Sequence, residues 1–351
     1  MRSINSAIIA MAIPVFLGSG GCQADEKTDA QFRSEIVTSM HQLLLTEVQG
    51  LNKAAHDLQA AAPMTSGRGW SSSDQAAITK MEDAWASARF SWERAEGTLA
   101  ALFPTFDESL DSRYEDLIQP LGAAGDANLF DGEGVTGMHA IERILYAADT
   151  PPAVVTFESS LPGYQAAAWP ATQAEATAFK ADLCGRFASD TQTLLDQWGP
   201  LAINLADVFQ GLTGLMSAQE EKVSRAADHQ EESRYSQRTM DDLRFNLAGT
   251  RAIYDLFIPW LGTKTYGTTL NSYAQMAFDR LRQTYDTVPD HAIPPPPATW
   301  NSTLPSVEDQ QTPFGKLYIA VVQEVDVTRP GSAVDAMNQV ARALGLPEFT
   351  K

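Results

Sequence analysis

Cysteine is scarce in this sequence, which holds only Cys22 and Cys184 among its 351 residues. Two cysteines are too few for a framework of disulfide bridges, so the hydrophobic core must stabilise the folded chain. The roughly 330 residues that follow the N-terminal segment are enough for two domains with substantial cores.

Basic residues are also few. Lysine and arginine number 25 against 44 aspartates and glutamates, which gives a formal net charge of -19 at pH 7. A protein that binds DNA or RNA needs a basic surface to meet the phosphates, so this balance excludes nucleic acid as a partner. An acidic surface instead favours solubility and attracts cations.

The pattern of a half-buried β-strand is missing as well, since no segment sustains a strict alternation of apolar and polar residues. Apolar residues instead recur at spacings of three and four, as in an amphipathic helix that faces a bundle core. The clearest stripe consists of Ile78, Met81, Trp85, Ala88, Trp92, Ala95, Leu99 and Leu102. We therefore predict an all-α protein built from helical bundles.

Interruptions of the helical pattern suggest two domains. The triplet Trp198-Gly199-Pro200 ends one long helical segment, and a second series of helical segments follows it. We place an N-terminal helical bundle at residues 22–199 and a C-terminal helical bundle at residues 200–351. Four prolines, Pro294 to Pro297, form a stiff extended connector within the second bundle.

The N-terminal segment has the layout of a secretory signal. Arg2 precedes an apolar run from Ala7 to Leu17, and small residues then lead into Cys22. Such a short run, with a proline inside it, cannot span a bilayer as a folded anchor. We expect residues 1–21 to be a lipoprotein-type signal and Cys22 to be lipidated, which leaves Cys184 without a partner. The alternative is ordinary signal cleavage and a soluble periplasmic product.

The most informative motif is Thr-Gly-Met-His-Ala-Ile-Glu at residues 136–142, which sets His139 and Glu142 three residues apart at the start of a predicted helix. Residues at that spacing share a helix face, and helical bundles build interior metal sites from such pairs. Thr136 can cap this helix, and the positive end of its dipole is expected to keep His139 neutral, as a metal ligand must be. The spacing alone fits a hydrogen-bonded pair without a metal equally well.

The segment Gly137 to Glu142 also matches a Gly-x-His-x-x-Glu motif, and in this the chain resembles the imelysin-like family, in particular the periplasmic EfeO and EfeM iron-uptake proteins. Trp85 through Glu96 is similar to that family's Trp, Arg, aromatic and Glu pattern, and Asp111-Ser112-Arg113 resembles its Asp-x-Arg. The resemblance implies a metal site made of Glu96, Asp111, His139 and Glu142. Three carboxylates and one imidazole form a hard, anionic donor set that suits iron or zinc rather than copper(I).

Other interpretations of these acidic residues stay open at this point. Periodicity alone predicts that Arg89 and Glu93 form an ion pair on an exposed helix edge. The resemblance makes both candidates for the surroundings of the metal site. Asp111 could instead cap a helix or pair with Arg113.

The second half of the chain offers further candidates. Residues 241–254 resemble the second-half signature of the imelysin-like family, whose site lies near the interface of the two halves, so Asn246 and Arg251 could face it. Gly249 in this segment could allow close helix packing. His229 and Glu232 repeat the His-x-x-Glu spacing without the preceding glycine or the apolar frame, and we predict a polar helix end there.

These observations favour an envelope-tethered protein that binds a metal ion and serves iron acquisition. Its partner would be a separate iron-transport component of the inner or outer membrane, because the chain shows no cupredoxin-like module or ferrous permease. The first alternative is a metallopeptidase of the imelysin type, although the sequence has no His-Glu-x-x-His helix and offers only Glu93 or Glu96 as a general base. The second is a structural or partner-binding helical lipoprotein without a metal.

Overall fold

The computed structural model describes residues 27–350, which form helices and loops without a β-strand. The α-helices, in chain order, are α1 (Asp29–Ala61), α2 (Gln75–Leu102), α3 (Pro104–Asp111), α4 (Tyr114–Ile118), α5 (Gly137–Leu145), α6 (Pro152–Glu158), α7 (Gln173–Ala178), α8 (Cys184–Trp198), α9 (Leu205–Ser224), α10 (Thr239–Asp255), α11 (Ile258–Leu261), α12 (Gly267–Asp286), α13 (Pro313–Val325) and α14 (Ala333–Leu344). The all-α prediction is confirmed.

The expected signal segment at residues 1–21 and the expected lipidation site Cys22 lie outside the described residues. Among helices between residues 27 and 350, none has both the length and the hydrophobicity needed to cross a bilayer.

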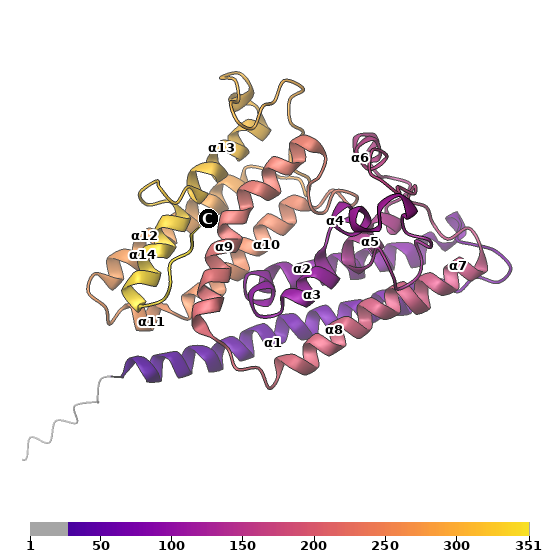
Figure 1. Ribbon diagram of the computed structural model, residues 1–351. Helices are drawn as coiled ribbons and strands as arrows, with labels where there is room; N and C mark the ends of the chain where they lie inside the picture. Colours follow the sequence, from indigo (N-terminus) through magenta and orange to yellow (C-terminus); the bar gives the residue numbers. More distant parts are fainter. Residues whose placement is uncertain (1–26, 351) are drawn as a thin grey trace, which may run out of the picture.

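The long helices α1 and α2 form the framework of the first half, and α8 packs against α1 (Figure 1). α1 begins with a capping box, in which Thr28 and Gln31 satisfy each other's backbone N–H groups, and it ends just before Pro63. α2 ends before Pro104, which starts α3. The apolar stripe that predicted α2 is buried from Ile78 to Leu99, because α2 is enclosed by helices from both halves of the chain.

The second half consists of α9 to α14, which occupy the upper left of Figure 1. The predicted break falls between α8 and α9, at residues 199–204. The start of α1 reaches the second half, where the Asp29 carboxylate accepts hydrogen bonds from Trp260 Nε1 at 2.8 Å and Lys264 Nζ at 2.7 Å. α1 and α2 therefore contact both halves.

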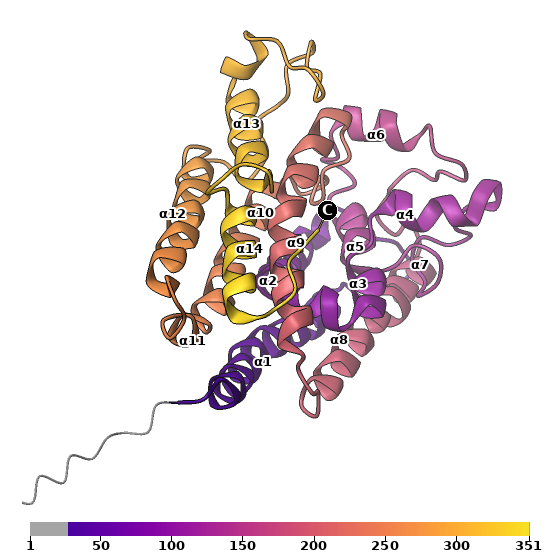
Figure 2. The same cartoon turned by 60° about the vertical axis from the view of Figure 1, so that its left-hand side comes forward.

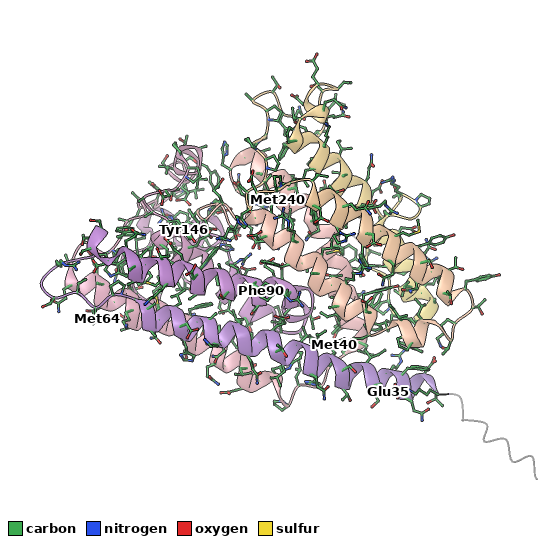
Figure 3. All side chains as sticks on the ribbon, turned by 180° about the vertical axis from the view of Figure 1, so that it is seen from behind. Glu35, Met40, Met64, Phe90, Tyr146 and Met240 are labelled. Carbon is green, nitrogen blue, oxygen red and sulfur yellow. The ribbon has the colours of Figure 1, made fainter. Side chains whose placement is uncertain are left out.

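The contact between α2 and α10 depends on Gly249. A Cβ atom at this position would lie 2.0 Å from the backbone oxygen of Arg94, which is closer than any real contact. The prediction that Gly249 allows close helix packing is confirmed. On the face seen in Figure 3, Phe90 of α2 meets Phe245 of α10 edge to face, with ring centroids 4.8 Å apart. This packing brings polar residues of α10 against the middle of α2.

Candidate metal centre

Gly137, the glycine of the Gly-x-His-x-x-Glu motif, brings the start of α5 against the end of α3. Its φ of 85° is one that side-chain-bearing residues rarely adopt. A Cβ here would also lie 2.8 Å from the backbone oxygens of Ser109 and Leu110. Because only glycine fits here, α3 and α5 lie side by side (Figure 2). This brings Asp111, at the end of α3, close to His139 in the first turn of α5.

His139 is held between two carboxylates and is only 1% exposed. Its Nδ1 lies 2.9 Å from Glu142 Oε2, and the other Glu142 oxygen accepts a hydrogen bond of 2.8 Å from the Ser236 backbone N–H. His139 Nε2 lies 3.3 Å from Asp111 Oδ1, an ion-pair distance, but it has no hydrogen-bond partner. Glu142 thus fixes the ring, and the free nitrogen points toward Asp111.

The expectation that the helix dipole keeps His139 neutral is wrong in this structure. Burial alone would lower the pKa of His139, but the carboxylates of Asp111 and Glu142 outweigh burial and raise the pKa to about 9. Two adjacent carboxylates act more strongly than the partial charge of a helix end. Thr136 does occupy the N-cap position of α5, but its side chain accepts no capping hydrogen bond.

α2 contributes Arg89, Glu93 and Glu96. Arg89 is 2% exposed and Glu93 is fully buried, so the prediction of an exposed ion pair is wrong. Arg89 pairs with Glu93 and also with Asp111 of α3. The physical reason for their burial is the packing of α10 over this face of α2, a long-range contact that helix periodicity does not reveal.

The second half of the chain adds three side chains to the cluster, those of Lys222, Glu232 and Asn246. Lys222 Nζ, from the last turn of α9, lies 2.9 Å from Glu96 Oε2, 3.3 Å from Glu93 Oε2 and 2.7 Å from Glu232 Oε2. Asn246 of α10 donates from Nδ2 to Glu93 Oε2 at 2.6 Å and to Glu96 Oε2 at 2.7 Å. The site therefore lies where the two halves meet.

The buried charges shift one another's pKa values in opposite directions. Burial raises the pKa of Glu93 well above its usual range and raises that of Glu96, although Lys222 opposes both shifts. Burial would also raise the pKa of Asp111 and of Glu232. Arg89 is the main group that instead holds the pKa of Asp111 below its usual range, and Lys222 does the same for Glu232. Asp111 and Glu232 are therefore the carboxylates best prepared to meet a cation in ionised form.

Two overlapping groups of donor atoms are close enough to hold a metal ion. The first is Asp111, His139 and Glu232, and the second is Glu93, Glu96, Asp111 and Glu232. Within each group the donor atoms lie within 4.8 Å of one another, close to the separation of roughly 4 Å that two metal–ligand bonds of about 2.1 Å can span. The unpartnered nitrogen of His139 belongs to the first group, so the donor set fits a metal ion there.

A pocket of about 350 Å³ gives access to this cluster from solvent. Its lining includes Glu96, Asp111, Lys222 and Glu232, with Asp107 and other polar residues around them. Burial, reinforced by Asp111, raises the pKa of Asp107 to about 6. The pocket is predominantly acidic, which suits the entry of a cation.

The structure brings most of the predicted site residues together. Asp111 lies close to both His139 and Glu96. Glu142 contacts the other nitrogen of His139, Arg89 pairs with Glu93 and Asp111, and Asn246 binds Glu93 and Glu96. Arg251 lies elsewhere, because it pairs with Asp279 at 2.7 Å and lines a different pocket.

Sequence reasoning missed Glu232 and Lys222. The sequence predicts a polar helix end at Glu232, but this residue lies in the loop between α9 and α10 and its side chain contacts Lys222 and Arg89. The repeated His-x-x-Glu spacing did point to this segment. It drew attention to His229, however, and gave no reason to expect that Glu232 alone reaches the site.

Comparisons with known proteins agree with this fold. The sequence model of one protein family, described as Imelysin, matches residues 37–315. No curated protein matches the chain. Among solved structures, a protein from Parabacteroides distasonis ATCC 8503 with the provisional name iron-regulated protein A precursor is similar, with a TM-score of 0.51 and 16% sequence identity. The match covers 92% of this chain and 95% of that chain, which supports the same fold throughout.

Proposed function

The chain belongs to the imelysin family, and on that premise we propose that it is an exported protein that binds a metal ion, with iron as its cargo. The support is a buried, mostly acidic donor set that lies beside a solvent-accessible pocket. Carboxylate oxygens and imidazole nitrogen suit iron, manganese or zinc and disfavour copper(I). The name of the structurally similar iron-regulated protein adds support for iron among these ions.

The observation that carries this proposal is the position of His139 Nε2, a buried nitrogen without a hydrogen bond that faces Asp111. In the metal-free fold a proton on this nitrogen is stabilised by the Asp111 carboxylate, and a metal ion would take the place of that proton. The nitrogen lies 3.3 Å from Asp111 Oδ1, and one ring nitrogen of His139 lies within 4.8 Å of a Glu232 oxygen. A metal ion bonded to all three atoms would satisfy the nitrogen and balance the charge of both carboxylates.

We propose the following roles for individual residues. Asp111, His139 and Glu232 bind the ion directly, and Glu96, which lies close to Asp111 and Glu232, is a fourth candidate ligand. Glu142, which the sequence suggested as a ligand, orients His139 through Nδ1. Arg89, Glu93 and Asn246 hold the carboxylates in place.

The cellular setting is part of the same proposal. Export and lipidation at Cys22 would place the protein at a membrane of the cell envelope, next to an iron-transport component that receives the ion. We also propose that residues 22–199 and 200–351 act as two bundles, since Asp111 and His139 come from the first and Lys222 and Glu232 from the second.

A metallopeptidase of the imelysin type is the alternative, and it requires a carboxylate free to act as a general base. Glu93 and Glu96 were the candidates for that role. The Oε2 atom of each accepts hydrogen bonds from Lys222 and Asn246, which reduces its capacity to accept a proton from water. This arrangement favours metal binding over hydrolysis.

The decisive experiment measures metal content and affinity of residues 27–351 under matched exposure to iron and zinc. We expect about one tightly bound equivalent in the wild type and its loss in His139→Ala/Glu142→Ala. His56→Ala is the matched control, because His56 is exposed on α1. Circular dichroism confirms that all variants are folded. Absence of binding by the wild type would refute the proposal, and peptide cleavage abolished by His139→Ala would support the peptidase instead.

A further inference from the structure

The two donor groups define two adjacent cation positions. Position A is bounded by Asp111, His139 and Glu232, and position B by Glu93, Glu96, Asp111 and Glu232. Asp111 and Glu232 belong to both groups. Two carboxylates shared in this way could bridge a pair of metal ions, since each carboxylate has two oxygens. The donor atoms by themselves would therefore allow two ions.

The ammonium group of Lys222 occupies position B. Its Nζ lies 2.9 Å from Glu96, 3.3 Å from Glu93 and 2.7 Å from Glu232, so it contacts three of the four carboxylates of that position. The Lys222 side chain is only 11% exposed. Position A also has a cation beside it, since the Arg89 guanidinium contacts Asp111 and lies 3.4 Å from Glu232. Its third donor, His139 Nε2, has no hydrogen bond and therefore remains available to an ion.

We propose that Lys222 is a tethered cation that fills position B and limits the centre to a single metal ion at position A. This inference rests on the proposed function. Lys222 contacts the carboxylates of Glu93, Glu96 and Glu232, which a metal ion at position B would need as ligands. Because two cations at this distance repel each other, a second ion could enter only if Lys222 left.

Arg89 can stay in place when Lys222 is removed. It pairs with Glu93 through Oε1, whereas Lys222 contacts Oε2 of the same carboxylate. Replacement of Lys222 by methionine keeps a flexible side chain of similar length without the charge. The oxygens of Glu93, Glu96 and Glu232 then face an open position.

The test is titration of residues 27–351 with Mn²⁺, a redox-stable ion that suits carboxylate ligands. Wild type is expected to bind about one equivalent with the six-line electron paramagnetic resonance signal of an isolated ion. Lys222→Met is expected to bind about two equivalents, with a signal broadened by coupling between neighbouring ions. Lys53→Met is the matched control, because it removes the same charge from an exposed position on α1 and should keep one equivalent.

Removal of Lys222 leaves carboxylates facing one another and could unfold the protein, so Lys222→Gln is titrated as well and both variants are checked by circular dichroism. Lys222→Gln keeps two hydrogen-bond donors without the charge and is also expected to bind two equivalents. One equivalent in the wild type and in a folded Lys222 variant would overturn this inference alone. No Mn²⁺ in any of the proteins, together with no iron or zinc, would overturn the proposed function and this inference with it.

Discussion

His139 Nδ1 lies 2.9 Å from Glu142 Oε2, and this contact assigns different roles to the two residues that share the motif. The imidazole has only one other nitrogen, Nε2, which points toward Asp111. Glu142 is occupied on both sides, because its second oxygen accepts the backbone N–H of Ser236. Under the proposed function, the spacing of three residues would supply a metal ligand and the group that orients it.

Glu142→Gln is expected to weaken metal binding by about 10- to 100-fold without abolishing it, as is typical for a residue that orients a metal-bound histidine. Glutamine keeps an oxygen for His139 or Ser236, but it lacks the charge that raises the basicity of the ring. Titration of the variant beside His139→Ala checks this. Equal and complete loss of binding in both variants would show that Glu142 is itself a ligand.

The stability of the metal-free protein should depend on the protonation of His139. Its pKa rises from an ordinary 6.5 to about 9 in the fold, so the charged ring stabilises the folded state fully below pH 6.5. That contribution, on the order of 3 kcal/mol, is lost as the pH rises through 9. Denaturant unfolding from pH 6 to 10 should show this loss in the wild type and not in His139→Gln. If the free energy of unfolding changed with pH in the same way in both proteins, the raised pKa of His139 would be contradicted.

Glu232→Gln is expected to lower metal affinity at least about tenfold, because it removes the charge of one of the two proposed carboxylate ligands. The neighbouring Glu231 serves as the matched control, since it belongs to neither donor group. Glu231→Gln should bind metal like the wild type. Equal effects of the two substitutions on affinity would remove Glu232 from the proposed ligands.

Gly249→Ala should separate α10 from α2. The added methyl group would lie 2.0 Å from the Arg94 backbone oxygen, and a backbone atom cannot move aside as a flexible side chain can. We expect a loss of about 3 kcal/mol or more in the free energy of unfolding, at the upper end for overpacking. Gly199→Ala is the control, because nothing lies within 4 Å of a Cβ there. Denaturant unfolding of both variants tests this, and equal stabilities would contradict the account of the helix contact.

Local patterns in the sequence determined most of the secondary structure. The stripe from Ile78 to Leu99 predicted α2 and is buried as expected. The cap at Thr28 and the end of α2 before Pro104 are likewise short-range features of the sequence. The Gly-x-His-x-x-Glu motif likewise marked His139 and Glu142, because both the positive φ of Gly137 and the spacing on α5 are local properties.

Only the tertiary structure decided which charges are buried together. The sequence pattern of Arg89 and Glu93 is that of an exposed ion pair, but α10 covers both side chains in the fold. Lys222 and Glu232 lie more than 80 residues after His139 in the sequence and contact the site only because the helices pack together. The protonation of His139 also depends on Asp111, which α3 brings within 3.3 Å. Electrostatic effects in a buried cluster depend on distances between separate helices, and these distances are set by packing that no local pattern records.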